Sequence, residues 1–330
     1  MRKQIIIILL ITAAASIVLL IFLSDYNPNH SRTAEPENIS IEVIVKSSDF
    51  AGFPFWNVIK QGVATASTDF QIKSTIQGPF TETQIDLQIE MIQEAVKRKP
   101  DAIVLAAADY KRLISVADEI WDAGIPLITI DSFIDSDKPL IRIGTDNYSA
   151  GAQAGDTLLK LIGKGKNLAI ISYVKETSSQ INREKGVRDK IADDGNIIGT
   201  WYSGGNITIS EQQVLQILED YPEIDGFIAL NEQSTLGAAQ AIDKFKRDRK
   251  VYLVGFDNST AIIQFVEQDI IQAIIVQKPF NMGYLGIKYA LDAINGKKIP
   301  TTVDTGAEII TRENMYTSEN QKLLFPVNRD

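Results

Sequence analysis

The chain of 330 residues contains no cysteine and a single histidine, His30. Without cysteine it can form neither a disulfide nor a thiolate metal site, and the residue that carries the lipid of a bacterial lipoprotein is missing. His30 precedes the region of regular pattern, so the folded part has no imidazole for a serine or cysteine triad or for a histidine-rich metal site. Neither a Gly-x-Ser-x-Gly elbow nor a phosphate-loop spacing occurs. We therefore expect no metal, no cofactor and no enzyme of these classes.

Basic residues are also in the minority, with 33 lysines and arginines against 42 aspartates and glutamates and a formal net charge of -9. A nucleic-acid partner requires an extended basic face. The basic runs at 97–99 and 244–250 are short and lie near predicted helix ends, where cations suit the helix dipole. The sequence therefore predicts no nucleic-acid partner.

A long uncharged stretch, Ile5–Leu23, follows two basic residues at the N-terminus. As a helix it would be about 28 Å long, close to the hydrocarbon thickness of a bilayer. Residues 1–24 are predicted to be an uncleaved membrane anchor or a cleaved signal segment, and small residues in the middle of the run favour the anchor. Either way the positive-inside rule places the rest of the chain outside the cytoplasmic membrane, in the periplasm or outside the cell. Residues 25–39 are predicted to be a polar tether.

Three apolar, β-branched runs end abruptly in a polar side chain, at Leu127–Asp131, Gly226–Asn231 and Val251–Asp257. A run without alternation indicates a strand buried on both faces of a parallel sheet. In open α/β sheets, ligands bind just beyond the carboxyl ends of such strands. These ends are therefore predicted to form a site for a small polar molecule.

Predicted strands alternate with predicted helices in two successive series. The strands of the first series lie near 41–45, 71–76, 102–105 and 127–131, and those of the second near 168–172, 197–202, 226–230 and 252–256. Helical spacing between them, and after the cap predicted at Thr83, supplies the covering helices. Two such series predict an α/β fold with two doubly wound parallel-sheet lobes that face each other across a cleft.

Eight short segments, each weak alone, occur in an order that resembles the type I periplasmic sugar-binding proteins, above all the ribose-binding proteins. They cover the chain from about residue 40 to 310: Gly52–Gly62, Pro100–Leu105, Gly124–Asp131, Gly144–Asn147, Arg183–Gly186, Asn231–Glu232, Val254–Asp257 and Val276–Gln277.

The resemblance implies two lobes joined by a three-crossover hinge. Lobe one would comprise 40–145 and 278–305, and lobe two 146–277 and 306–330. It also implies an extracytoplasmic receptor that closes on a monosaccharide or related polyol. The partner would be the permease of a sugar ABC transporter or a membrane histidine kinase, and a retained anchor favours the sensor role.

Seven residues match the ligand-binding pattern of that family: Phe55, Trp56, Asp131, Arg183, Asn231, Asp257 and Gln277. By the resemblance, the two aromatic rings would cover the apolar faces of a sugar, while the aspartates accept hydroxyl protons and the arginine donates. Asn231 and Gln277 would do both. Structural alternatives stay open: core packing for the aromatics, helix capping or a hinge role for the aspartates, and solvation for the arginine.

The chain departs from the ribose-binding pattern at three places. Ser132 stands where that pattern has a second cation, and Phe53 stands where it has an asparagine. The aromatic residue of the second lobe falls near Gly205, with Trp201 and Tyr202 close by. Such a pocket should not prefer ribose, so a hexose, a pentose, inositol or another polyol stays open.

Two other function classes are weighed against the receptor. Asp131 and Asp257 on opposite lobes could act as the carboxylate pair of a glycoside hydrolase, although carboxylates that accept sugar hydroxyls are the commoner arrangement. A regulator of the lactose-repressor type would need a basic helix-turn-helix at the N-terminus, where this chain has the apolar stretch. We therefore predict a binding protein and not an enzyme.

Overall fold

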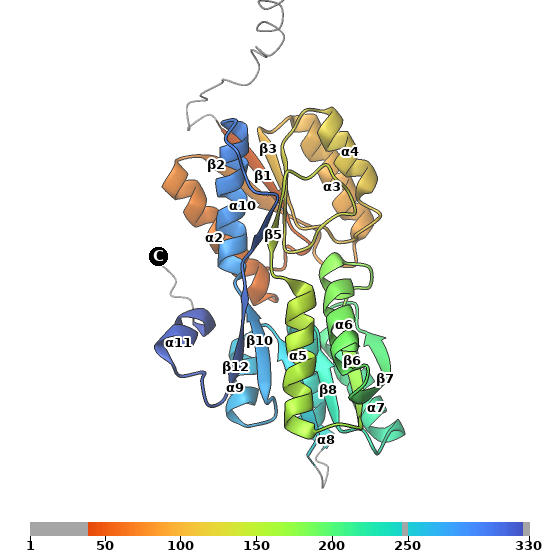
Figure 1. Cartoon of the computed structure of the whole chain (residues 1–330). Helices are drawn as coiled ribbons and strands as arrows, with labels where there is room; N and C mark the ends of the chain where they lie inside the picture. The colour runs from red at the N-terminus through yellow and green to blue at the C-terminus, as the bar shows by residue number, and fades with distance from the viewer. Residues whose placement is uncertain (1–38, 246–249, 326–330) are drawn as a thin grey trace, which may run out of the picture.

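The computed structural model describes residues 39–245 and 250–325, which form two α/β lobes arranged end to end (Figure 1). Each lobe contains a six-stranded sheet with helices on both faces. The predicted fold class is confirmed in this respect. The predicted membrane segment at 1–24 and most of the tether lie outside the described residues, and no helix within the described ranges is long and apolar enough to cross a membrane.

The sheet of the first lobe is entirely parallel, in the order β11-β5-β4-β3-β1-β2. Its strands are β1 (Ser40–Ile44), β2 (Lys73–Gln77), β3 (Ala102–Leu105), β4 (Leu127–Ile130), β5 (Ile141–Gly144) and β11 (Thr302–Asp304). Helices α2 (Pro54–Phe70) and α10 (Pro279–Ile294) cover one face, and α3 (Ile85–Arg98) and α4 (Ile114–Asp122) the other. Val43 packs toward the first helix pair and its neighbour Ile44 toward the second, which explains why this strand is apolar without alternation.

The sheet of the second lobe has the order β12-β10-β9-β8-β6-β7, and only β12 is antiparallel to its neighbour. Its strands are β6 (Lys166–Ser172), β7 (Gly195–Tyr202), β8 (Gly226–Ala229), β9 (Tyr252–Phe256), β10 (Ala273–Gln277) and β12 (Ala307–Thr311). Helices α5 (Asn147–Ile162) and α6 (Ser178–Ile191) cover one face. Helices α7 (Ile207–Asp220), α8 (Glu232–Phe245) and α9 (Thr260–Glu267) cover the other, where α11 (Ser318–Leu324) also packs through Leu324.

The chain passes between the two sheets at three places: from β5 to α5, from β10 to α10, and from β11 to β12. Helix α10 therefore packs beside α2 in the first lobe although it lies late in the sequence (Figure 1). Because the three connections run side by side, they can serve as a hinge about which the lobes rotate.

Helices α5 and α6 of the second lobe approach each other closely at two glycines. A methyl group on Gly151 would lie 2.1 Å from the carbonyl oxygen of Arg183, and one on Gly186 would lie 2.1 Å from that of Tyr148. Such distances are far below van der Waals contact, so only glycine fits at these positions. The contact sets the position of the α6 turn that carries Arg183.

Candidate functional site

The carboxyl ends of the strands in both lobes meet at one cavity between the lobes. All seven residues predicted from the sequence line it: Phe55, Trp56, Asp131, Arg183, Asn231, Asp257 and Gln277. Seven further residues complete the lining: Lys46, Phe53, Glu82, Tyr173, Ser179, Glu232 and Gln233. The structure thus brings together side chains that are more than 200 positions apart in the sequence.

The two lobes touch each other around this cavity. The amide of Tyr110 donates to the carbonyl of Glu176 at 2.8 Å, and the amide of Phe133 donates to Ser178 Oγ at 2.6 Å. The cavity measures about 30 Å³, whereas pockets for small organic ligands measure roughly 300 to 1,000 Å³. The structure therefore represents a closed arrangement, and a molecule of sugar size can enter only if the lobes separate.

Asp131 and Asp257 occupy equivalent places in the two lobes. Asp131 directly follows β4 with φ 58°, and Asp257 directly follows β9 with φ 66°. Aspartate tolerates this left-handed conformation better than most residues, because its short side chain can form local hydrogen bonds. The turn directs both carboxylates into the cavity, where they are almost fully buried.

A buried lysine, Lys46, forms the centre of the first-lobe side of the site. Its Nζ lies 3.0 Å from Asp131 Oδ2, 3.1 Å from Ser132 Oγ and 3.8 Å from Glu82 Oε2. Burial lowers the pKa of Lys46, but the charges of Asp131 and Glu82 outweigh burial and raise it overall. The lysine is therefore a permanent cation. In the family pattern a second cation stands at the place that Ser132 occupies here. In this chain Lys46, just after β1, supplies a positive charge instead.

The aromatic pair Phe55 and Trp56 begins helix α2, directly after Pro54. The two rings are perpendicular, with centroids 5.1 Å apart, and Trp56 Nε1 donates to Glu82 Oε1 at 3.0 Å. Trp56 is 1% exposed and also belongs to the core of the first lobe. The core-packing alternative therefore holds for Trp56 alongside its place in the cavity wall, and its hydrogen bond orients Glu82.

Arg183 is buried at the second-lobe side and is held by two hydrogen bonds. Its Nε donates to Asn147 Oδ1 at 2.7 Å, and its Nη1 donates to the carbonyl of Leu230 at 2.7 Å. The guanidinium stacks over Phe256, 4.5 Å from the ring centroid. Arg183 is 2% exposed, so it is not a solvated surface residue.

Three second-lobe groups, Asp257, Gln277 and Glu232, form a polar cluster. Gln277 Nε2 donates to Asp257 Oδ1 at 2.7 Å. Burial raises the pKa of Asp257, and the positive charge of Arg183 only partly offsets this. Burial and the negative charge of Asp257 together raise the pKa of Glu232 to about 8, although a hydrogen bond from the backbone of Phe55 lowers it. Glu232 is therefore mostly protonated at neutral pH.

Asn231 has a structural task in addition to its place in the cavity wall. Its Oδ1 accepts from the amide of Ser234 at 3.0 Å, and its Nδ2 donates to Gln233 Oε1 at 2.7 Å. The first bond satisfies an amide at the beginning of α8, as an N-cap does. In the same lobe, Tyr173 donates to Ser179 Oγ at 2.7 Å, and Ser179 pairs with Ser132 of the first lobe at 2.9 Å.

Three oxygen atoms of the cavity wall have no hydrogen-bond partner within the described part of the chain: Glu82 Oε2, Glu232 Oε2 and Gln277 Oε1. Gln277 Oε1 is an acceptor because the amide nitrogen of the same side chain is committed to Asp257. Buried polar atoms normally have partners, so these oxygens identify where a ligand with hydrogen-bond donors would bind.

The resemblance suggested an aromatic residue of the second lobe in the cavity, near position 205, with Trp201 and Tyr202 as candidates. Neither of the two is that residue. Trp201 packs against Tyr221, and the hydroxyl of Tyr202 donates to Glu184, and neither lines the cavity. Tyr173 takes this place. It follows β6, just as Lys46 follows β1, so a search for polar residues behind each apolar run would have found both. Glu82 lies in a loop before α3 and has no such signal.

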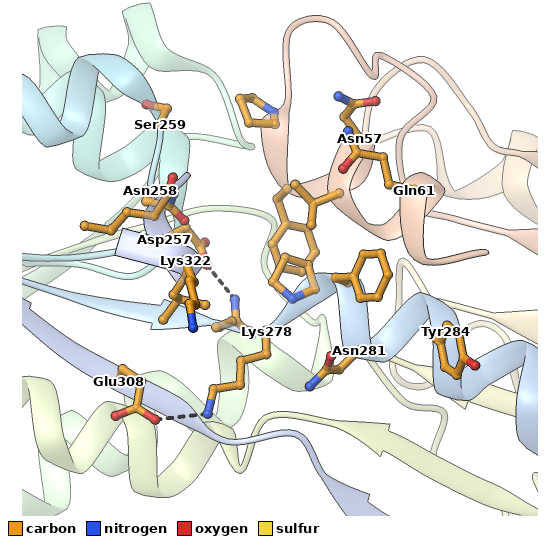
Figure 2. Close-up of a pocket in the computed structure, with 18 of the residues that line it drawn as sticks. Asn57, Gln61, Asp257, Asn258, Ser259, Lys278, Asn281, Tyr284, Glu308 and Lys322 are labelled. Carbon is orange, nitrogen blue, oxygen red and sulfur yellow. Dashed lines mark hydrogen bonds and ion pairs between the residues drawn. The ribbon is translucent and has the colours of Figure 1, made fainter. Parts of the chain in front are cut away.

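A second and larger cavity of about 1140 Å³ opens beside the inter-lobe cavity (Figure 2). Figure 2 shows Asn57 and Gln61 of α2 on one side of this groove and Asp257 and Asn258 on the other. Phe55, Asp257 and Gln277 line both cavities. Because the groove has walls from both lobes, its width depends on how far the lobes are closed.

Comparison with known proteins assigns the chain to a family. Residues 43–298 match the periplasmic binding protein domain, so the chain belongs to that family. It is 26% identical over 297 residues to a D-ribose/D-allose-binding protein of Pseudomonas aeruginosa, across 86% of this chain and 91% of that protein. These relatives are binding proteins, which confirms the prediction that the chain is not an enzyme. Family membership implies an extracytoplasmic location.

Solved structures show the same architecture. An ABC transporter solute-binding protein from Agrobacterium vitis with bound D-fucose is 30% identical, with a TM-score of 0.83 over 86% of this chain and 99% of that chain. A sugar transporter from Clostridium phytofermentans is 38% identical, with a TM-score of 0.77 over 82% of this chain and 98% of that chain. The predicted resemblance to type I periplasmic sugar-binding proteins is confirmed.

Proposed function

We propose that this protein is an extracytoplasmic receptor that binds a monosaccharide or related polyol between its lobes and closes on it. The observation that carries the proposal is the single buried cavity on which aromatic rings and hydrogen-bonding groups from both lobes converge. Apolar ring faces and fixed polar groups are what a sugar requires, because its C–H faces are apolar and its hydroxyls need partners. Relatives named for ribose and allose binding, and a structure with bound D-fucose, support this class of ligand.

In this proposal the seven residues predicted from the sequence bind the ligand, together with Lys46, Glu82 and Glu232. Asp131 and Asp257 accept from hydroxyls, and Lys46 and Arg183 donate to sugar oxygens. Closure brings the two sets of residues onto the ligand, so the ligand binds the closed form better and shifts the population toward it. We propose that the moving lobes are 40–145 with 278–305 and 146–277 with 306–330, and that the three connections act as their hinge.

Hydrolysis of a glycoside fits the geometry less well than binding. A hydrolase needs one carboxyl that protonates the leaving group and one that stays ionised and free to attack or to activate water. Asp131 is held by Lys46 and Ser132, and Asp257 accepts from Gln277. These contacts orient both groups as fixed acceptors.

A membrane partner would detect closure. We propose the permease of a sugar ABC transporter, with a membrane histidine kinase as the alternative that a retained N-terminal anchor favours. The groove in Figure 2 changes shape with lobe closure and offers a surface on which a partner could detect it. If the partner is a permease, uptake of labelled sugar fails when the protein is deleted; if it is a kinase, uptake persists and the transcriptional response to the sugar is lost.

A thermal-shift screen against monosaccharides and polyols tests the binding function. A ligand present at 100 to 1,000 times its Kd stabilises the folded protein by about 3 to 4 kcal/mol. Asp257→Ala is expected to abolish this shift, because the variant lacks the buried acceptor at the end of β9. The exposed Asp193→Ala in the same lobe is the matched control and should retain the shift. A full shift in the Asp257 variant would show that the ligand binds elsewhere.

A further inference from the structure

The cavity between the lobes contains more acidic than basic side chains. Its charged lining consists of Glu82, Asp131, Glu232 and Asp257 against Lys46 and Arg183. Lys46 is already paired with Asp131 and Glu82. Arg183 donates to the side chain of Asn147 and to the carbonyl of Leu230, and within the described residues it has no carboxylate at ion-pair distance. Each side of the cavity thus has two carboxyl groups and one cation, but only on the second-lobe side are the two carboxyl groups, Glu232 and Asp257, without an ion pair within the described residues.

Two of the three cavity oxygens that have no hydrogen-bond partner within the described residues also lie on the second-lobe side. These two atoms are Glu232 Oε2 and Gln277 Oε1, and neither has a hydrogen-bond partner within the described residues. Glu232 is 5% exposed, so water at the protein surface does not solvate its carboxyl. A ligand that fits here brings donors, and preferably a positive charge, to Glu232.

The protonation of Glu232 agrees with this arrangement. Burial and the charge of Asp257 raise its pKa to about 8, so the carboxyl is mostly neutral at neutral pH unless a positive charge lies beside it. A cation bound beside it would supply the missing compensation and restore the ionised carboxylate.

We propose that the ligand of this cavity is an amino sugar whose ammonium group binds the carboxylate of Glu232, and that Glu232 sets this specificity. The inference rests on the proposed function, because it assumes that the cavity binds a sugar. An ammonium group offers three donors and one charge, while a hydroxyl offers one donor and no charge. The two oxygens without a partner, both acceptors once Glu232 is ionised, and the two second-lobe carboxyl groups without an ion pair favour the ammonium.

Binding of an amino sugar should change the protonation state of Glu232, whereas binding of a neutral sugar should not. When the ammonium binds, the O–H bond of the Glu232 carboxyl breaks and its proton passes to the buffer, leaving an ion pair. Binding of an amino sugar therefore releases close to one proton, whereas binding of the neutral parent sugar releases none.

Isothermal titration calorimetry on the purified chain tests this with D-glucosamine, D-galactosamine and D-mannosamine, each beside its parent hexose. The pH is set so that the free amine is protonated, and each titration is repeated in two buffers of different ionisation enthalpy. We expect at least one amino sugar to bind more tightly than its parent by about tenfold or more, with release of a proton. Glu232→Gln should reduce the ratio of the two affinities toward one and abolish the proton release. The exposed Glu219→Gln on α7 is the matched control and should change neither.

Three outcomes would overturn the inference. Equal or weaker binding of every amino sugar relative to its parent contradicts it without touching the proposed function. Retention of the preference in the Glu232 variant assigns the specificity to another residue. A chain that binds neither class contradicts the proposed function itself, and the inference with it. The first comparison uses only the unaltered chain, so it stands even if the variant fails to fold.

Discussion

Replacing Lys46 by methionine tests the electrostatic arrangement of the site. The substitution removes a buried cation that lies 3.0 Å from Asp131 and 3.8 Å from Glu82, and leaves both carboxylates buried. Removing one partner of a buried ion pair typically costs about 3 to 5 kcal/mol, because the remaining charge has no compensation. We expect Lys46→Met to lower the unfolding free energy by this amount at neutral pH.

The penalty should depend on pH in a defined direction. Burial raises the pKa of Glu82, and Lys46 counteracts this, so loss of the lysine raises that pKa further. As the pH falls, the carboxyl of the variant takes up a proton and the uncompensated charge disappears. The difference between variant and unaltered protein should therefore shrink from neutral toward mildly acidic pH.

Urea denaturation of both proteins at neutral and mildly acidic pH measures these differences. Lys97→Met is the matched control, because it removes the same side chain from an ion pair with Glu94 that is largely exposed. Exposed pairs contribute little, so this variant should unfold like the parent. Equal stability of the Lys46 variant and the control at neutral pH, or a penalty that grows with acid, would refute the reasoning.

Three further predictions follow from the second lobe. The pKa of Glu232 in the folded protein, about 8, exceeds its ordinary value of 4.5, so this carboxyl destabilises the folded state increasingly as the pH rises between these values. Glu232→Gln should therefore stabilise the protein by on the order of 3 kcal/mol near neutrality. A melting-point gain that does not increase with pH would contradict this. Gly151→Ala should lower the unfolding free energy by roughly 1 to 3 kcal/mol and weaken sugar binding, because its methyl group would meet the backbone of Arg183. Chemical denaturation and a binding assay measure both effects, and wild-type values in both would exclude that contact. Asn231→Ala and Asn206→Ala each remove a helix-cap acceptor, so each should lower the unfolding free energy by about 1 kcal/mol. Only Asn231 lines the cavity, so only its variant should lose sugar affinity. An equal loss of affinity in both variants would count against the place of Asn231 in the binding site.

The architecture could be predicted because its strands carry an unambiguous signal. β3 and β4 are nearly continuous apolar runs, because helices cover both faces of the sheet and every position of these two strands is buried. Strands β5, β10 and β11 were not predicted. The first and last are short and include exposed positions, so they have no distinctive run, whereas β10 is a fully buried apolar run that was missed. The helix expected to begin at a Thr83 cap begins at Ile85 instead, and its cap residue Gln84 forms no side-chain hydrogen bond to the helix.

The site could be predicted where a polar residue follows a strand, and less well elsewhere. Asp131 and Asp257 lie where parallel strands end, and the geometry of the sheet brings them to one cavity. Lys46 also follows a strand, but it was not predicted as a site residue, because the family pattern has its second cation at the place of Ser132. Glu232 stands in a recognised segment without an assigned role, because the surroundings that leave its Oε2 without a partner form only when distant parts of the chain meet. The fit of Gly151 against α6 depends on a backbone distance that no local pattern encodes.

A crystal structure of the protein with the sugar that gives the largest thermal shift is the most direct test of the account. We predict that the sugar lies between the lobes, in contact with Asp131 from the first and with Arg183 and Asp257 from the second. A sugar bound in the outer groove of Figure 2, or on one lobe alone, would contradict the claim that both lobes close on the ligand.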